Sequence, residues 1–125
     1  MNIPSELKYT TEHEWVKVDG KIATIGITEY AQGELGDVVF IEMPAIGTKV
    51  KALQAFGTIE AVKAVSELFS PVSGTITEVN KLLENDPTAV NRDCYGDGWM
   101  IRVEMNNPAE LDKLLPAAEY RKLVE

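Results

Sequence analysis

Apolar and polar residues alternate in short runs along the first 105 positions, and many of the apolar positions hold β-branched or aromatic residues. A period of two with this composition is typical of half-buried β-strands. Residues that favour turns, chiefly glycine, proline, asparagine and aspartate, separate the runs. The pattern therefore predicts strands at residues 14–18, 21–25, 38–43, 56–59, 68–72, 72–79 and 99–105.

Two pairs of these runs predict β-hairpins. Asp19-Gly20 lies between the first two runs, and this dipeptide suits a two-residue turn whose central residues need positive φ. The second hairpin joins residues 56–59 to 68–72, and its connector carries a single cation, Lys63. The chain must reverse between these two runs, so we expect Lys63 at or near the tip of the hairpin.

Helical signals are short until the last 20 residues. Thr28 can cap one short helical turn, because glycines at 33 and 36 oppose a longer helix. From residue 107 the period becomes helical: Asn107-Pro108-Ala109-Glu110 combines a cap, a proline at the first helical position and a capping-box glutamate. Pro116 then interrupts, and residues 117–124 predict a second short helix.

Many short strands followed by helix only at the end predict a mainly β protein. The expected architecture is a small antiparallel β-sandwich or flattened barrel with short helices. We expect one domain over residues 1–125, with a helical tail at about 106–125 packed on the β core.

Composition narrows the possible partners and sites. The 12 basic and 20 acidic residues give a net charge of −8, which argues against nucleic acid and anionic membranes and favours docking on basic surfaces. With one histidine, His13, and one cysteine, Cys94, neither a transition-metal site nor an internal disulfide is expected. The first residues have no signal-peptide pattern, so we expect a cytoplasmic protein, or a mitochondrial one only if a transit peptide was removed.

Six motifs occur together in the order and spacing of one known family. The chain resembles the H-proteins of the glycine cleavage system, which are lipoyl carriers with a lipoyl/biotinyl-type barrel-sandwich hybrid fold. It departs from the family pattern at Ala61, where serine is usual, and at Cys94, where proline is usual. The motifs are His13-Glu14-Trp15, residues 25–32, residues 35–40, Glu60-Ala61-Val62-Lys63-Ala64, Ser70-Pro71-Val72-Ser73-Gly74 and Tyr95-Gly96-Asp97-Gly98-Trp99.

The resemblance implies a non-catalytic, monomeric carrier with lipoic acid attached as an amide to Lys63 by a lipoate-attaching enzyme. The arm would accept an aminomethyl group from glycine at a pyridoxal-phosphate decarboxylase, the P-protein. It would deliver this group to a tetrahydrofolate-dependent aminomethyltransferase, the T-protein, and be reoxidised by dihydrolipoamide dehydrogenase, the L-protein. The implied role is therefore aminomethyl transfer in glycine catabolism and one-carbon metabolism.

The residues around Lys63 suit this role. A visiting arm needs a protruding, unbranched anchor, and tethering raises its effective concentration at each partner. Glu60 and Glu67 flank the lysine and are candidates for recognition by partners. A loaded arm carries an amine, and we expect a carboxylate to hold it. Glu14, beside the bulky Trp15, and Glu67 are the candidates for that acid.

Other interpretations of Lys63 remain open from the sequence. A Schiff-base lysine would need an apolar pocket or neighbouring cations, whereas Glu60 and Glu67 lie nearby. Biotin carriers usually place methionine on both sides of the lysine, but here the neighbours are Val62 and Ala64. A store that relays lipoyl groups to other complexes, and a homologue that no longer receives lipoate, are further alternatives. His13 we interpret as a structural hydrogen-bonding residue rather than a general base.

Overall fold

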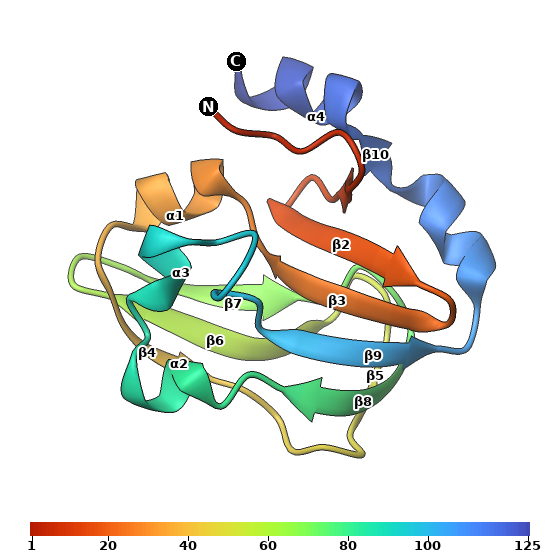
Figure 1. Cartoon of the computed structure of the whole chain (residues 1–125), viewed down its shortest axis with the longest axis horizontal. Helices are drawn as coiled ribbons and strands as arrows, with labels where there is room; N and C mark the ends of the chain where they lie inside the picture. Colours follow the sequence, from red (N-terminus) through yellow and green to blue (C-terminus); the bar gives the residue numbers. More distant parts are fainter.

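Two antiparallel sheets face each other across one hydrophobic core in the computed structural model, which describes all 125 residues (Figure 1). The larger sheet has seven strands in the order β10-β1-β2-β3-β9-β8-β5, and the smaller has three in the order β4-β6-β7. The predicted mainly β sandwich is confirmed, and the sheets do not close into a barrel.

Ten strands and five helical segments follow one another along the chain. The strands are β1 Lys8–Tyr9, β2 Glu14–Asp19, β3 Ile22–Ile27, β4 Val38–Glu42, β5 Lys49–Val50, β6 Ala55–Ala61, β7 Val65–Phe69, β8 Gly74–Val79, β9 Ile101–Met105 and β10 Leu115–Pro116. The helices are α1 Glu29–Leu35, α2 Leu82–Asn85, α3 Ala89–Arg92, the 3₁₀ helix η1 Pro108–Lys113 and α4 Ala117–Val124.

The core forms where the period-two pattern turns its apolar residues inward. Ile25, Ile76 and Ile101 of the large sheet are at most 1% exposed, as are Ile59 and Leu68 of the small sheet. All five belong to one buried cluster. Burying each such side chain contributes about 1.5–3 kcal/mol, so the two sheets hold each other in place.

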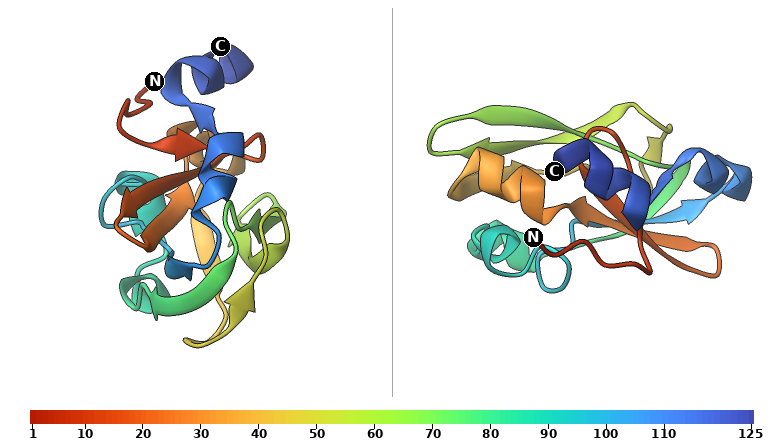
Figure 2. Two further views of the ribbon diagram at one scale, coloured as in Figure 1. Left: turned by 90° about the vertical axis from the view of Figure 1, so that its right-hand side faces the viewer. Right: turned by 90° about the horizontal axis from the view of Figure 1, so that it is seen from above.

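A second, smaller apolar cluster joins the two ends of the chain. Tyr120 of α4 stacks on Tyr9 of β1, with ring centroids 4.7 Å apart and an interplanar angle of 10°. Ile3, Leu7 and Trp15 complete this cluster. The tail therefore packs beside the N-terminal segment, and both termini lie at the same side of the molecule (Figures 1 and 2).

The first hairpin differs in detail from the expected turn. Asp19 is the last residue of β2 and pairs with Ile22, so the loop consists of Gly20 and Lys21 rather than Asp19-Gly20. Gly20 has φ of 62°, whereas Asp19 has no positive φ. The glycine alone takes the left-handed conformation that a side chain disfavours.

Helix α1 is longer than the single turn expected. Thr28 caps it as predicted, since its hydroxyl oxygen accepts a hydrogen bond from the Ala31 amide at 3.2 Å. Gly33 lies inside the helix because Ala31 and Leu35 pack against the core and offset its low helix propensity. Gly36, with φ of 81°, ends the helix.

The tail differs most from the predicted α-helix. Residues 108–113 form a 3₁₀ helix, and Leu115–Pro116 form a short strand that pairs with β1. Glu110 makes no capping box, because its carboxylate accepts hydrogen bonds from the Ser73 amide at 2.7 Å and the Ser73 hydroxyl at 2.8 Å. Long-range partners therefore override the local capping pattern.

Further differences concern short or polar elements. Strand β7 begins at Val65, three residues before the predicted start, because its first half consists of exposed residues. The two-residue strands β1, β5 and β10 and the four-residue helix α3 were not expected. Cys94 is buried, and its carbonyl oxygen accepts a hydrogen bond from the Trp15 indole at 3.0 Å. A proline at this position would keep that carbonyl, so the departure from the family pattern preserves the contact.

Two glycines provide a test of this packing. Gly26 pairs with Trp15, and a Cβ at Gly26 would lie 2.8 Å from the indole ring, whereas a Cβ at Gly33 would meet nothing within 4 Å. We expect Gly26→Ala to lower the free energy of unfolding by about 1–3 kcal/mol. The matched change Gly33→Ala should raise it by about 0.5–1 kcal/mol. Urea unfolding measures both, and equal effects of the two changes would contradict this packing.

Candidate functional site: a lysine-bearing hairpin beside an acidic cleft

Lys63 lies at the tip of the β6–β7 hairpin, as predicted. The two strands are joined by Val62, Lys63 and Ala64, which are all exposed. The Ala61 amide donates to the Ala64 carbonyl at 2.7 Å and closes the loop. The hairpin extends past the sheets at the end of the molecule where α1 and α3 also lie (Figures 1 and 2). The lysine is therefore exposed at a tip that extends beyond the sheets.

The segment between α1 and β4 supports this tip. The Val62 amide donates to the Asp37 carbonyl at 3.0 Å. A Cβ built on Gly36 would lie 3.2 Å from Cε of Lys63, so the lysine stem passes close over the Gly36 backbone. Glycine at 36 thus serves two needs, its positive φ and this close approach.

A cleft of about 340 Å³ opens beside the hairpin, between the loop that precedes β2, helix α1 and strand β7. Its lining includes Leu35, which precedes Gly36, and the neighbouring residues Ser66 and Glu67. Ser66 is three positions after Lys63, which along a strand corresponds to ~10 Å. The lining residues are Glu12, His13, Glu14, Ile27, Tyr30, Ala31, Glu34, Leu35, Ile59, Ser66, Glu67 and Leu68.

The lining combines an apolar part with a set of acids. Five aliphatic side chains line the cleft, and three of them, Ile27, Ile59 and Leu68, also belong to the core. Four glutamates line it as well, with no lysine or arginine among them. A concave site with one sign of charge concentrates ions of the opposite sign. The cleft therefore suits an elongated apolar group with a cationic end.

Glu14 is the buried acid of this cleft, with 2% of its surface exposed. The Thr10 hydroxyl donates to one carboxylate oxygen at 2.7 Å, and the Phe69 amide approaches the other at 3.4 Å. Burial outweighs these hydrogen bonds and raises the pKa of Glu14 to about 8. At neutral pH the group is therefore mostly protonated, and a cation placed against it would favour ionisation.

His13 shapes the cleft by its backbone conformation. Its φ is 71°, in the left-handed region, and the Thr28 amide and Thr10 carbonyl bond its backbone. Its Nδ1 atom makes a 2.8 Å hydrogen bond with the Tyr120 hydroxyl, and its ring lies 4.8 Å from that of Tyr30. Burial lowers the pKa of His13. The predicted structural hydrogen bond of His13 is thus present.

The structure brings some of the predicted site residues together and separates others. Glu14 and Glu67 line the same cleft although 53 positions apart. Glu60 does not line it: it is exposed on β6, in register with Phe40 and Val65.

The sequence interpretation missed two further acids of the cleft, Glu12 and Glu34. Tyr30 and Glu34 lie four positions apart on α1, as do Ala31 and Leu35, and all four line the cleft. This helical spacing is a signal that could have found Glu34. No such local signal exists for Glu12, whose place in the cleft depends on the loop that precedes β2.

The fold contains neither a cluster of metal-ligating side chains nor a membrane-spanning helix. No group of three or more His, Cys, Asp or Glu side chains is arranged to hold a metal ion. None of the helices combines the length and apolar character needed to cross a lipid bilayer.

The raised pKa of Glu14 predicts a specific dependence of stability on pH. The folded protein holds a proton on Glu14 that the unfolded chain releases near the ordinary value of 4.5. Its contribution to stability is therefore complete below pH 4.5 and is lost as pH rises through about 8. At ~1.4 kcal/mol per pKa unit, the loss is on the order of a few kcal/mol.

Glu14→Gln removes this titration, and all other groups are shared with the wild type. We expect the free energy of unfolding of the wild type minus that of the variant to become smaller as the pH is raised from 5 to 9. Urea unfolding of both proteins at these two pH values measures the difference. A difference between the two proteins that stays constant with pH would contradict the assignment.

The chain is similar over nearly its whole length to one family of known proteins. The glycine cleavage H-protein family model matches residues 7–125. The glycine cleavage system H protein of Carboxydothermus hydrogenoformans is 54% identical, with 98% of this chain and 95% of that protein covered. The H protein of Staphylococcus carnosus is 51% identical, with 99% and 98% covered.

The fold agrees as well. The crystal structure of a glycine cleavage system H protein from Mycobacterium marinum superposes with a TM-score of 0.89, at 37% identity and with 96% of this chain and 97% of that chain covered. This chain thus belongs to the glycine cleavage H-protein family, the lipoyl carriers of the glycine cleavage system.

Proposed function

We propose that Lys63 carries the lipoyl group, as an amide on its side-chain nitrogen. The observation that supports this most strongly is its position: Lys63 is exposed at the tip of a projecting hairpin, and the hairpin borders the acidic cleft. The exposed tip also argues against a Schiff-base lysine, which needs a desolvated pocket or neighbouring cations.

The cleft fits the arm and its cargo. Its aliphatic lining suits a hydrocarbon chain, and its volume is in the range of small-molecule sites. The lipoyl disulfide supplies the group that takes up aminomethyl from glycine. We propose that Glu67 and Glu14 hold the resulting amine while the cleft limits its contact with water. Glu14 would give up its proton as the cation arrives, because an adjacent positive charge lowers the pKa of a carboxyl group.

The chain itself performs no catalysis in this proposal. It presents the arm in turn to the pyridoxal-phosphate decarboxylase (P-protein), the tetrahydrofolate-dependent aminomethyltransferase (T-protein) and dihydrolipoamide dehydrogenase (L-protein). We propose that the chain does this as a monomer. The bacterial origin of the relatives supports a cytoplasmic location.

We further propose that Glu60 and Glu67 mark the tip for the lipoate-attaching enzyme. Glu60 stands between Phe40 and Val65 in a row across the outer face of β4, β6 and β7. Phe40 is 51% exposed and Val65 is 69% exposed. An acid between two exposed apolar side chains is complementary to a partner surface on which a basic side chain lies among apolar side chains.

Attachment at Lys63 can be tested by intact mass. After expression with a lipoate-attaching enzyme, we expect a gain of one lipoyl group for the wild type and none for Lys63→Arg. The matched control Lys81→Arg changes another exposed lysine and should keep the full gain. A gain that persists in Lys63→Arg, or a folded wild type with no gain, would show that the proposed attachment site is wrong.

The role of the two acids can be tested on loaded protein. We expect Glu14→Gln/Glu67→Gln to lose the aminomethyl group roughly tenfold faster than the wild type, because the amine loses the two acids proposed to hold it. The control Glu42→Gln/Glu104→Gln removes two exposed acids that do not line the cleft and should not change the rate. Mass spectrometry over time measures the loss, and equal rates in the two double variants would refute the role.

A further inference from the structure

The tip that carries Lys63 depends on a segment 25 residues earlier in the chain. This segment, Gly36 to Val38, is here called the connector. Its Asp37 carbonyl accepts the hydrogen bond from Val62, the residue before Lys63, and its Gly36 backbone lies under the lysine stem. Motion of the connector backbone therefore moves Val62 and the neighbouring Lys63.

One side chain holds the connector from the opposite direction. Asn91, on α3, accepts a hydrogen bond from the Val38 amide at 2.9 Å and donates one to the Gly36 carbonyl at 2.8 Å. Its amide nitrogen also donates to Oε1 of Gln32, on α1, at 3.0 Å. The backbone groups decide the orientation of the amide, because an N–H can only donate and a carbonyl can only accept. Asn91 thus binds the connector on both sides of Asp37.

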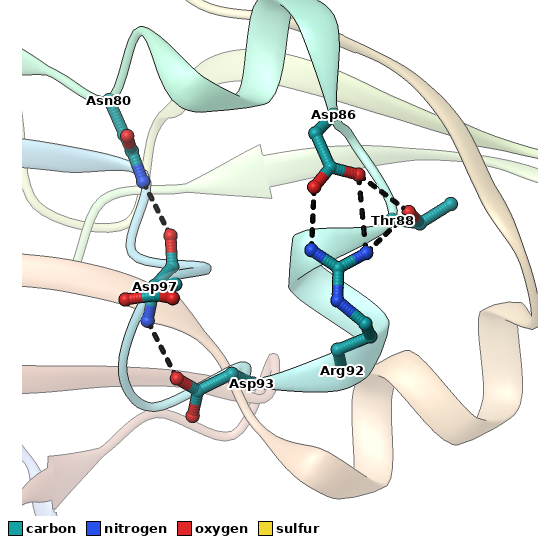
Figure 3. Close-up of polar contacts among 6 residues, drawn as sticks. All are labelled: Asn80, Asp86, Thr88, Arg92, Asp93 and Asp97. Atoms are coloured by element: carbon teal, nitrogen blue, oxygen red, sulfur yellow. Dashed lines mark hydrogen bonds and ion pairs between the residues drawn. The ribbon is translucent and has the colours of Figure 1, made fainter.

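The helix that carries Asn91 is itself fixed. Ala89 and Val90 of α3 are fully buried in the core. Arg92 pairs with Asp86 at 2.5 Å and donates to the Thr88 hydroxyl at 2.9 Å (Figure 3). These contacts hold both ends of the short helix.

The chain that follows α3 is held too. The Asp97 amide donates to the Asp93 carboxylate at 2.9 Å, and the Asp97 carbonyl accepts from the side chain of Asn80 at 2.7 Å (Figure 3). Asn91 therefore projects from a fixed support.

We propose that Asn91 is a positioning residue for the carrier lysine. Its hydrogen bonds to Gly36 and Val38 fix the backbone of Asp37 between them. The Asp37 carbonyl in turn fixes Val62, and so the neighbouring Lys63. This inference rests on the proposed attachment at Lys63. Asn91 reaches the arm only through the connector. Holding the tip in one conformation removes an ordering cost that each visiting enzyme would otherwise meet. Loss of the grip should therefore slow attachment of lipoate roughly tenfold in kcat/KM, through a higher KM rather than a lower kcat.

The first test uses the unmodified protein and does not depend on lipoate. In Asn91→Ala we expect the Val62 amide to exchange with solvent at least about tenfold faster, and trypsin to cut after Lys63 correspondingly faster. The control Glu110→Ala removes another side chain that makes two hydrogen bonds with a distant segment, accepting from the amide and the hydroxyl of Ser73. Unchanged Val62 exchange in Asn91→Ala, or equal loosening of Val62 in Glu110→Ala, would overturn the proposal.

A second variant covers the case in which Asn91→Ala does not fold. Asn91→Asp keeps the shape and the acceptor for the Val38 amide but replaces the donor to the Gly36 carbonyl by an oxygen. We expect it to fold and to loosen Val62 to an intermediate extent. Wild-type protection of Val62 in this variant would show that the grip on Gly36 does not hold the tip.

The lipoate-attaching reaction then separates the two proposals. If no protein is modified at Lys63, the attachment site is wrong, whereas the exchange data still report on the Asn91 grip. If the wild type is modified and Asn91→Ala loosens Val62 but is modified with an unchanged KM, the proposed positioning role is wrong.

Discussion

The position of Lys63 depends on the burial of the part of the β6–β7 hairpin that lies farthest from its tip. Ile59 and Leu68 point into the core from β6 and β7, while Val62, Lys63 and Ala64 are exposed at the far end. The buried base gives the hairpin a fixed direction, and the exposed tip leaves the lysine free to carry a long group. A carrier needs both properties, since a lysine buried in the core could not reach a partner's active site.

The cleft next to the tip combines exposed, charged acids with one buried acid that is mostly neutral. The cleft contains exposed acids such as Glu67 and one buried acid, Glu14, whose pKa of about 8 keeps it mostly neutral until a cation arrives. A neutral buried acid costs less to desolvate than a permanent charge. It can still ionise when an amine lies beside it, so Glu14 can be neutral in the empty cleft and charged in the loaded one.

The two ends of the chain and the helical segments frame this arrangement. Tyr120 of α4 bonds both His13 in the cleft wall and Thr28 at the start of α1. Asn91 of α3 bonds the connector that supports the hairpin tip. The helices of this mainly β protein thus contribute to the placement of its cleft and its tip as well as to its core.

Local pattern was enough to determine the β-rich class, the hairpin with Lys63 at its tip and the cap at Thr28. The class and the hairpin depend on whether neighbouring side chains face the core or the solvent, and residue type reports that directly. The cap depends on a threonine hydroxyl that accepts a hydrogen bond from an amide three positions later. Only the tertiary structure decided the rest. Glu12, Glu34 and Glu67 meet in one cleft from three separate elements, and residues 108–113 form a 3₁₀ helix although their local sequence favours an α-helix. These features depend on contacts between residues distant in sequence, whose partners no local period specifies.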